Sequence, residues 1–270
     1  MLLQRRDGEV LDEARATTRG AAHTFALACR LLPRRVRSDV YLLYLVFRTL
    51  DDLVDTGHPA AGARLASVEA WGGGGGARCR EARLLADVAT RHPLPRRALV
   101  DFCRGMRDDL DDVLIDTEDD LDRYCYRVAG TVGIVMASVL GTHGDAHDQA
   151  AALGMAMQRT NILRDIDEDR ANGRTYIPRE TLARFGTIAP GRREDLLRDH
   201  IARADALYEV GMSGIPRLRS GRRAIAAAAC MYREILRQIE REGYGARVGR
   251  AVVPRARKLL IAARRGVSPP

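Results

Sequence analysis

The sequence is poor in several features that mark other classes of protein. Only 5% of its 270 residues are aromatic, and no RNP, zinc-finger or basic-region motif accompanies its net charge of +8, which argues against nucleic-acid binding. Its longest apolar run, at residues 131–140, is well short of the ~18 residues of a membrane span. The five cysteines form no CxxC pair, which predicts free thiols in a reducing compartment. Residues 1–14 lack the apolar stretch of a signal peptide, so we expect a cytoplasmic protein.

The residues that are present show a helical pattern almost throughout. Hydrophobic residues make up 46% of the chain, and they recur with a period of 3.6 rather than 2. Glycine and proline separate the predicted helices, which cover roughly residues 13–31, 38–56, 63–70, 78–91, 95–115, 119–140, 146–170, 192–213, 217–242 and 250–264. We predict a single all-α domain over residues 1–270, with a flexible glycine linker at 72–76 and a disordered tail at 265–270.

Two segments place carboxylates at helical spacing beside apolar stripes. In residues 47–55 (FRTLDDLVD), Asp51 and Asp55 share a helix face with Arg48. In the second segment, QRTNILRDIDED, an amide and two carboxylates form a row at i, i+4 and i+8, beside a glutamine and an arginine: Asn161, Asp165, Asp169, Gln158 and Arg164.

The pairing of these rows indicates a metal site. A single acidic row is usually a solvated surface, and we interpret residues 107–120 in that way. Two rows beside apolar stripes need a positive partner, because like charges at i and i+4 destabilise a helix by about 0.2–0.5 kcal/mol per pair. Facing rows would hold Mg²⁺, which binds few carboxylates and recruits substrate phosphates. The interleaved arginines suit diphosphate oxygens.

The chain resembles the squalene/phytoene synthase family over about residues 24–260. The resemblance rests on these stretches: Thr24-Phe25 with Leu31 to Pro33, YLLYLVFRTLDDLVD (41–55), YCYRVAGTVG (124–133), QRTNILRDIDEDRANGRTYIP (158–178), YREIL (232–236) and VPRARKLL (253–260). The patterns YCYxVAGTVG and NILRDxxEDxxxGRxY are highly specific. The resemblance implies an all-α class I isoprenoid synthase bundle with a central active-site cavity.

The resemblance also implies roles for individual residues. Ligands of Mg²⁺, or of Mn²⁺ in its place, fall on Asp51, Asp55, Asn161, Asp165 and Asp169. Tyr232 joins the four aspartates as a catalytic residue. Diphosphate-binding residues fall on Thr24, Tyr44, Arg48, Gln158, Arg164, Arg174, Tyr176 and Lys258. The prenyl tunnel is expected to be lined by Phe25, Tyr126, Ala129, Gly130 and Gly133.

The implied reaction is a Mg²⁺-dependent, head-to-head (1′-1) condensation of two prenyl diphosphates of C15 or C20. The leading interpretation joins two geranylgeranyl diphosphates into phytoene through a cyclopropylcarbinyl diphosphate, with release of diphosphate. NADPH is not expected, because a product made without hydride keeps its central triene. A hydrocarbon product and a net charge of +8 favour peripheral contact with an anionic membrane.

Other interpretations stay open at this point. They are a squalene or dehydrosqualene synthase using farnesyl diphosphate, a class I terpene synthase or prenyltransferase acting on one prenyl diphosphate, and a non-catalytic helical assembly factor. Residues 22–25 (AHTF) replace the family's usual Ser-x-Ser-Phe, and Asp167 stands where a glycine is common. Tyr44 and Tyr232 suit buried core positions equally well, and Arg174 suits a surface loop.

Overall fold

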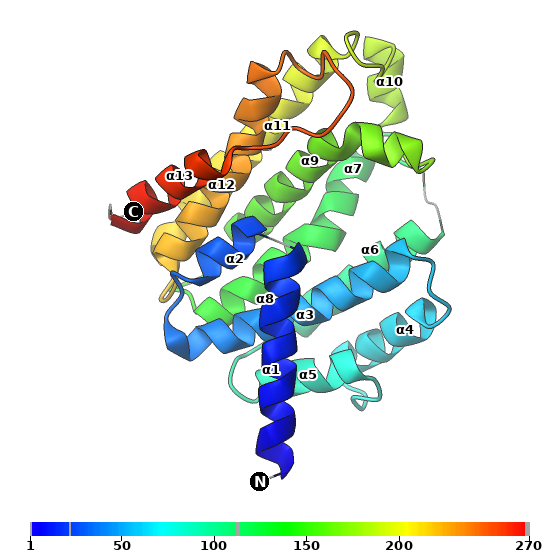
Figure 1. The fold of residues 1–270 in the computed structure, drawn as a ribbon. Coiled ribbons are helices and arrows are strands. Elements are labelled where there is room, and N and C mark those ends of the chain that lie inside the picture. The colour runs from blue at the N-terminus through cyan, green and yellow to red at the C-terminus, as the bar shows by residue number, and fades with distance from the viewer. Residues whose placement is uncertain (1, 22, 112–113, 268–270) are drawn as a thin grey trace.

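The described part of the chain, residues 2–21, 23–111 and 114–267 of a computed structural model, is built from helices (Figure 1). In chain order they are α1 (Leu2–Ala21), α2 (His23–Cys29), α3 (Arg34–Asp55), α4 (Ala61–Gly72), α5 (Arg80–Ala89), α6 (Arg96–Leu110), α7 (Glu118–Cys125), the π-helical turn η1 (Tyr126–Gly130), α8 (Thr131–Leu140), α9 (His147–Ala171), α10 (Arg179–Phe185), α11 (Glu194–Ser213), the 3₁₀ turn η2 (Ile215–Arg217), α12 (Arg222–Arg241) and α13 (Arg255–Val267). No strand forms within these residues, and one isolated bridge joins Thr142 and Leu218. The all-α prediction is confirmed.

Most predicted helices lie within a few residues of their expected bounds, with three differences. The segment predicted as 13–31 is divided into α1 and α2. The helix predicted at 119–140 contains the turn η1, which apolar periodicity cannot reveal because a π turn inserts only one extra residue. The short helix α10 was not predicted.

The disorder of the tail at 265–270 stays a prediction, and the structure describes residues 265–267 as helical. These residues continue α13, and the first proline that would stop the helix comes at Pro269. Residues 268–270 lie outside the described residues. The glycine tract joins α4 to α5, and the N–H groups of Gly73 and Gly75 close α4 by bonding to the carbonyls of Glu69 and Ala70, each at 2.8 Å. The flexibility of the tract stays a prediction.

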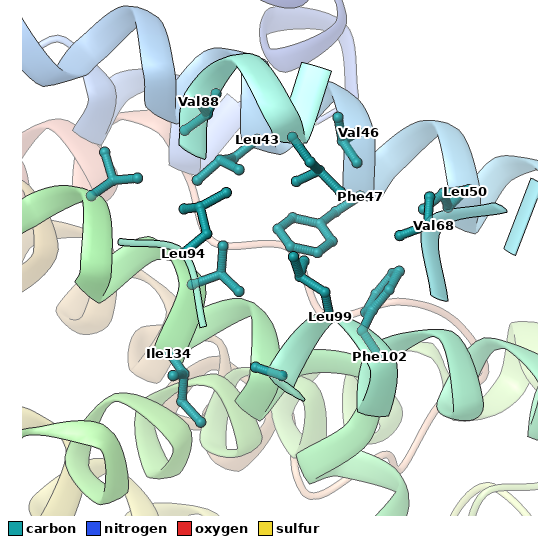
Figure 2. Packing of buried hydrophobic residues seen from close by; sticks show 14 of the residues in the cluster. Leu43, Val46, Phe47, Leu50, Val68, Val88, Leu94, Leu99, Phe102 and Ile134 are labelled. Carbon is teal, nitrogen blue, oxygen red and sulfur yellow. The ribbon is translucent and has the colours of Figure 1, made fainter. Parts of the chain in front are cut away.

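Two hydrophobic clusters meet along the middle of the bundle. The first joins α3, α4, α5, α6 and α8, and Figure 2 shows Phe47 of α3 among its members. The ring of Phe47 meets that of Phe102 of α6 edge-on, with centroids 4.8 Å apart. The second cluster joins α7, α9, α11 and α12, and Val128 of η1 packs against both. The α3 and α9 helices therefore each have one face fixed by a core.

The helix α9 lies at the centre of the molecule in Figure 1 and packs closely on η1 and α8. A Cβ on Gly154 of α9 would lie 2.2 Å from the carbonyl oxygen of Ala129, and one on Gly133 would lie 2.2 Å from that of Ala150. These glycines let the two backbones approach more closely than any larger residue allows.

The cysteines agree with the sequence-based expectation. All five are free thiols, and Cys29, Cys103 and Cys125 are buried. Burial raises the pKa of each of these three thiols to about 12, so they remain protonated at neutral pH. Among the described residues, no helix is both long enough and apolar enough to cross a membrane.

The close contact between η1 and α9 leads to a stability prediction. Gly154→Ala is expected to lower the free energy of unfolding by about 1–3 kcal/mol, because its Cβ would force α9 away from the backbone of η1. Gly62→Ala is the matched control, because a Cβ there meets nothing within 4 Å, and it should stabilise α4 by about 0.5–1 kcal/mol. Urea unfolding of both variants checks this, and equal effects would contradict the packing argument.

Candidate active site

The acidic row of α3 lies opposite a buried apolar face. Leu50 and Val54 are 1% and 3% exposed and hold the helix against the first core cluster. The carboxylates are thereby turned away from that core. Arg48 pairs with the nearest two acids, at 3.1 Å from Asp51 and 2.5 Å from Asp52. The predicted neighbourhood of Arg48 and Asp51 is thus present.

The acidic row of α9 is positioned in the same way. Ile162, Leu163 and Ile166 are buried in the second core cluster. Arg164 donates two hydrogen bonds to Asp165, at 2.8 and 2.5 Å. The amide of Asn161 donates to Gln158 at 3.3 Å.

The two rows face each other. Arg174, which follows α9, donates to Asp55 at the end of α3 over 3.0 Å, so this arginine is not a free surface residue. The pKa of Asp169 is raised to about 6, first by burial and then by the charges of Asp165, Glu168 and Asp55. The pKa of Asp51 is raised to about 7, first by burial and then by Asp55. The negative charges of α3 and α9 are therefore close enough to repel one another.

Aromatic and basic residues predicted to bind diphosphate border these rows. Phe25 of α2 stacks on Tyr44 with ring centroids 5.2 Å apart. The pKa of Tyr44 is raised to about 12, chiefly by burial, and the charge of Arg48 opposes this rise. Tyr44 and Tyr232 are both half-buried and Tyr232 packs against the second core cluster, so their role at a diphosphate stays a prediction.

The basic side of this border includes Arg164 and Lys258. Although burial lowers it, the pKa of Arg164 is raised overall by Asp165 and Tyr232. Burial lowers the pKa of Lys258, and the charges of Arg164, Arg250 and Arg255 also lower it. Thr24 lies on α2 beside Phe25, and its hydroxyl makes no hydrogen bond within the described residues; Ala22 lies outside them.

The residues predicted to line a prenyl tunnel lie on α2, η1 and α8. Phe25 and Tyr126 pack against the first core cluster. Gly130 and Gly133 lie against α9, where small residues are needed for helix contact whether or not a tunnel is present. Their role in holding a prenyl chain stays a prediction.

Asp109 of α6 is a site residue that the sequence interpretation missed. It accepts hydrogen bonds from Tyr124 at 3.1 Å and from Tyr176 at 3.2 Å, and the two rings stack with centroids 5.1 Å apart. Burial raises the pKa of Asp109 to about 6, and Asp55 adds a smaller upward effect. The interpretation of residues 107–120 as a solvated face is therefore wrong here. The tyrosine partners are 15 and 67 residues away, which no local pattern reveals.

Glu118 corrects the same interpretation for a structural reason. It accepts hydrogen bonds from Arg159 at 3.0 Å and from Thr181 at 2.6 Å. Arg159 is 2% exposed and also bonds to Asp122 at 2.7 Å. This acidic residue thus holds α7 against α9 and α10.

Arg250 is the second missed residue, and a buried ion pair positions it. Its Nε lies 2.8 Å from Asp165. Arg193, 2% exposed, donates to both oxygens of Asp167 at 2.6 and 2.8 Å, and the N–H of Gly249 donates to Asp167 at 2.9 Å. The aspartate that departs from the family pattern therefore anchors the loop that carries Arg250 to the site.

The donor set fits divalent cations. The Oδ1 atom of Asn161 is buried and has no hydrogen-bond partner among the described residues, and Asp51 and Asp169 repel nearby carboxylates. A divalent cation would satisfy both features with oxygen ligands. As the side chains stand, no three His, Cys, Asp or Glu residues in the described ranges converge on one point. Arginines pair with the acids instead.

The raised pKa of Asp51 gives a pH-dependent prediction. Its folded-state value of about 7 exceeds the unfolded value of about 4, so this carboxylate lowers the stability of metal-free protein as the pH rises through that window. Asp51→Asn should therefore stabilise metal-free protein at pH 8 and change it much less at pH 4. Because the side chain is 41% exposed, the gain is on the order of 1 kcal/mol or less. Urea unfolding with a chelator measures it, and a gain of equal size at both pH values would contradict the explanation.

The Asp167–Arg193 pair gives a prediction of opposite sign. The hydrogen bonds from Arg193 lower the pKa of Asp167, so the pair stabilises the fold above the unfolded pKa of about 4 and less as the pH falls below it. Asp167→Asn should lower the free energy of unfolding by about 3–5 kcal/mol at pH 7, because it leaves Arg193 buried and unpaired. As a control, Asp12→Asn breaks an exposed pair with Arg15 and should change the free energy of unfolding by about 1 kcal/mol at most. Similar losses of unfolding free energy in both variants would contradict the explanation that burial makes the first pair more costly to break.

Comparison with known proteins agrees with this geometry. The sequence profile of the squalene/phytoene synthase family matches residues 18–257. A phytoene synthase of Thermus thermophilus is 37% identical, with 84% of this chain and 82% of the relative aligned, and a 15-cis-phytoene synthase of Synechococcus elongatus is 35% identical, with 93% and 90% aligned. The crystal structure of a dehydrosqualene synthase superposes with a TM-score of 0.88 at 29% identity, covering 97% of this chain and 96% of the other. The chain is therefore a member of the squalene/phytoene synthase family and has its class I isoprenoid synthase fold.

Proposed function

We propose that the protein joins two molecules of geranylgeranyl diphosphate head to head and produces phytoene. The observation that carries the proposal is the facing of the two acidic rows, on α3 and α9, with arginines between them. Relatives named as phytoene synthases, 35–37% identical over most of their length, favour C20 substrates and a product formed without NADPH.

The metal of this proposal is Mg²⁺, with Mn²⁺ as a substitute. Its ligands are Asp51, Asp55, Asn161, Asp165 and Asp169. When bound, the metal supplies the positive charge that makes diphosphate a better leaving group. The raised pKa values of Asp51 and Asp169 support these positions, because a cation there offsets repulsion that the folded chain otherwise retains.

The polar residues around the rows bind and orient the two diphosphates. Forked guanidinium groups match phosphate oxygens, and this role falls to Arg48, Arg164, Arg174 and the newly found Arg250. Further contacts are assigned to Thr24, Tyr44, Gln158, Tyr176, Tyr232 and Lys258. Phe25 and the residues of η1 and α8 hold the prenyl chains and exclude water from the cations that form.

The chemistry proceeds in two stages, each releasing one diphosphate and one proton. In the first, the C1–O bond of one substrate breaks, and the C2–C3 double bond of the other attacks the allylic cation, giving a cyclopropylcarbinyl diphosphate. In the second, that diphosphate leaves and the cation rearranges to the 1′-1-linked C40 triene. The chain's own contribution is to position both substrates and to neutralise the departing charge.

The setting of the reaction belongs to the same proposal. We place the enzyme in the reducing cytoplasm as one domain over residues 1–270, with five free cysteines. Substrate and product are lipids, so we further propose peripheral contact with a membrane surface.

Product analysis tests the proposal. Purified protein with Mg²⁺ is given farnesyl or geranylgeranyl diphosphate, each with and without NADPH, and the extracts are examined by mass spectrometry. A C40 triene from geranylgeranyl diphosphate without NADPH is expected. A C30 product from farnesyl diphosphate alone would move the substrate to C15. Diphosphate release with only C15 or C20 products would instead indicate an enzyme that uses one diphosphate.

Variants on α9 test the assigned carboxylates. Asp165→Asn should reduce condensation at least about a hundredfold, because it removes a metal ligand whose electrostatic effect contributes several kcal/mol. Asp148→Asn is the matched control, an exposed aspartate at the other end of the same helix, and should retain activity. Full activity in folded Asp165→Asn protein would refute the assignment.

A further inference from the structure

The net positive charge of the chain is concentrated at its C-terminal end. Residues 243–270 contain seven arginines and lysines and no aspartate or glutamate, which leaves 37 basic and 36 acidic residues in the first 242. Almost the whole net charge of +8 therefore comes from about one tenth of the sequence. Such an asymmetry is typical of a surface that meets a polyanion.

The same segment carries most of the exposed apolar side chains. Of seven large hydrophobic residues that are exposed in the described chain, four lie here: Val248, Val252, Leu259 and Leu260, exposed by 76%, 64%, 58% and 50%. Between them, Ala251 and Val253 are 8% and 3% exposed and pack into the second core cluster. The exposed apolar side chains thus belong to a segment that is held in place by its buried neighbours.

The cations of this segment are divided between the site and the solvent. Arg250 lies 2.8 Å from Asp165, and Arg257 pairs with Glu234 at 2.6 Å. Arg247 and Arg255 are exposed and form no ion pair with a described residue. In Figure 1, the chain leaves α12, crosses the ends of the helices and returns as α13 along α12. The same C-terminal segment therefore borders the site through Arg250 and presents the exposed cations Arg247 and Arg255 to solvent.

We propose that residues 247–260, through Arg247, Val248, Val252, Arg255, Leu259 and Leu260, form a docking surface for an anionic phospholipid bilayer. Arginines at the headgroup level and apolar side chains below it are the combination that holds an amphipathic segment in a membrane interface. This C-terminal docking surface places Arg250 and Lys258 at the membrane, where a prenyl diphosphate enters. It rests on the proposed function only in the lipid nature of substrate and product.

A bilayer fits this surface better than another polyanion. An RNA or an acidic protein would pair with the arginines, but a polyanion would leave two valines and two leucines in contact with water. A lipid interface accommodates both kinds of side chain at once.

Vesicle binding of the full chain tests the charge component. The protein should co-sediment with phosphatidylcholine vesicles that contain phosphatidylglycerol, and much less with phosphatidylcholine alone. R247Q/R255Q should lower the partition coefficient about fivefold for each arginine, so about twenty-five-fold in total. R83Q/R223Q, which removes two exposed arginines of α5 and α12, is the matched control and should change it about twofold at most. Equal losses in both variants would overturn the proposal.

A tryptophan reporter tests the apolar component. The single native tryptophan, Trp71, is 4% exposed, so its emission is insensitive to vesicles. The emission maximum of V252W should shift to shorter wavelength on vesicles that contain phosphatidylglycerol. It should return to its original wavelength in 1 M salt, where the Debye length is about 3 Å. The emission of V210W, at another exposed valine, on α11, should not shift. A shift in both, or in neither, would overturn the docking surface.

The outcomes distinguish this inference from the proposed function. Condensation assayed in detergent without vesicles reports on the function alone. A C40 product from protein that ignores anionic vesicles would overturn only the docking surface. Specific vesicle binding by protein that makes no condensed product would overturn the proposed function and leave the surface intact.

Discussion

The mutual repulsion of carboxylates on α3 and α9 is the interaction on which the rest of this structure depends. Each row would be solvated on an isolated helix, but here apolar faces fix both helices so that the charge of Asp55 contributes to the raised pKa of Asp169. The folded chain offsets part of that charge with Arg48, Arg164 and Arg174. The remaining raised pKa values are what a metal cluster and diphosphates would relieve. The repulsion between these carboxylates is therefore complementary to the cations proposed to bind there.

A buried ion pair outside the two acidic rows supports the arrangement of charges at the site. The buried pair of Asp167 and Arg193 holds the loop after α12, and this loop delivers Arg250 to Asp165. A buried ion pair contributes little net stability by itself, but it fixes a single arrangement of the groups around it. Here the arrangement that it fixes continues into α13, so the same segment serves the proposed diphosphate site and the proposed docking surface. Binding of substrate and contact with a membrane would then use one structural element.

The extent to which the site followed from the sequence depends on how local its signals are. Rows at i and i+4 on α3 and α9 were readable because helix geometry alone puts their side chains on one face. Asp109 was misread because its acidic stretch looks like a solvated surface and its tyrosine partners are distant in sequence. The π turn η1 lies within a strongly helical stretch and left no periodic signal. Arg250 was one of many arginines in a chain that has a single lysine.

The sequence by itself determined the fold class, the helices and the two acidic rows, because each of these follows from interactions between residues within a few positions of one another. The resemblance of its motifs was sufficient to identify the family. Only the tertiary structure decided that the rows face each other, that Asp109 joins them, and that Asp167 directs a loop 82 residues away. These contacts are set by how apolar faces pack, and packing depends on the whole chain rather than on any local pattern.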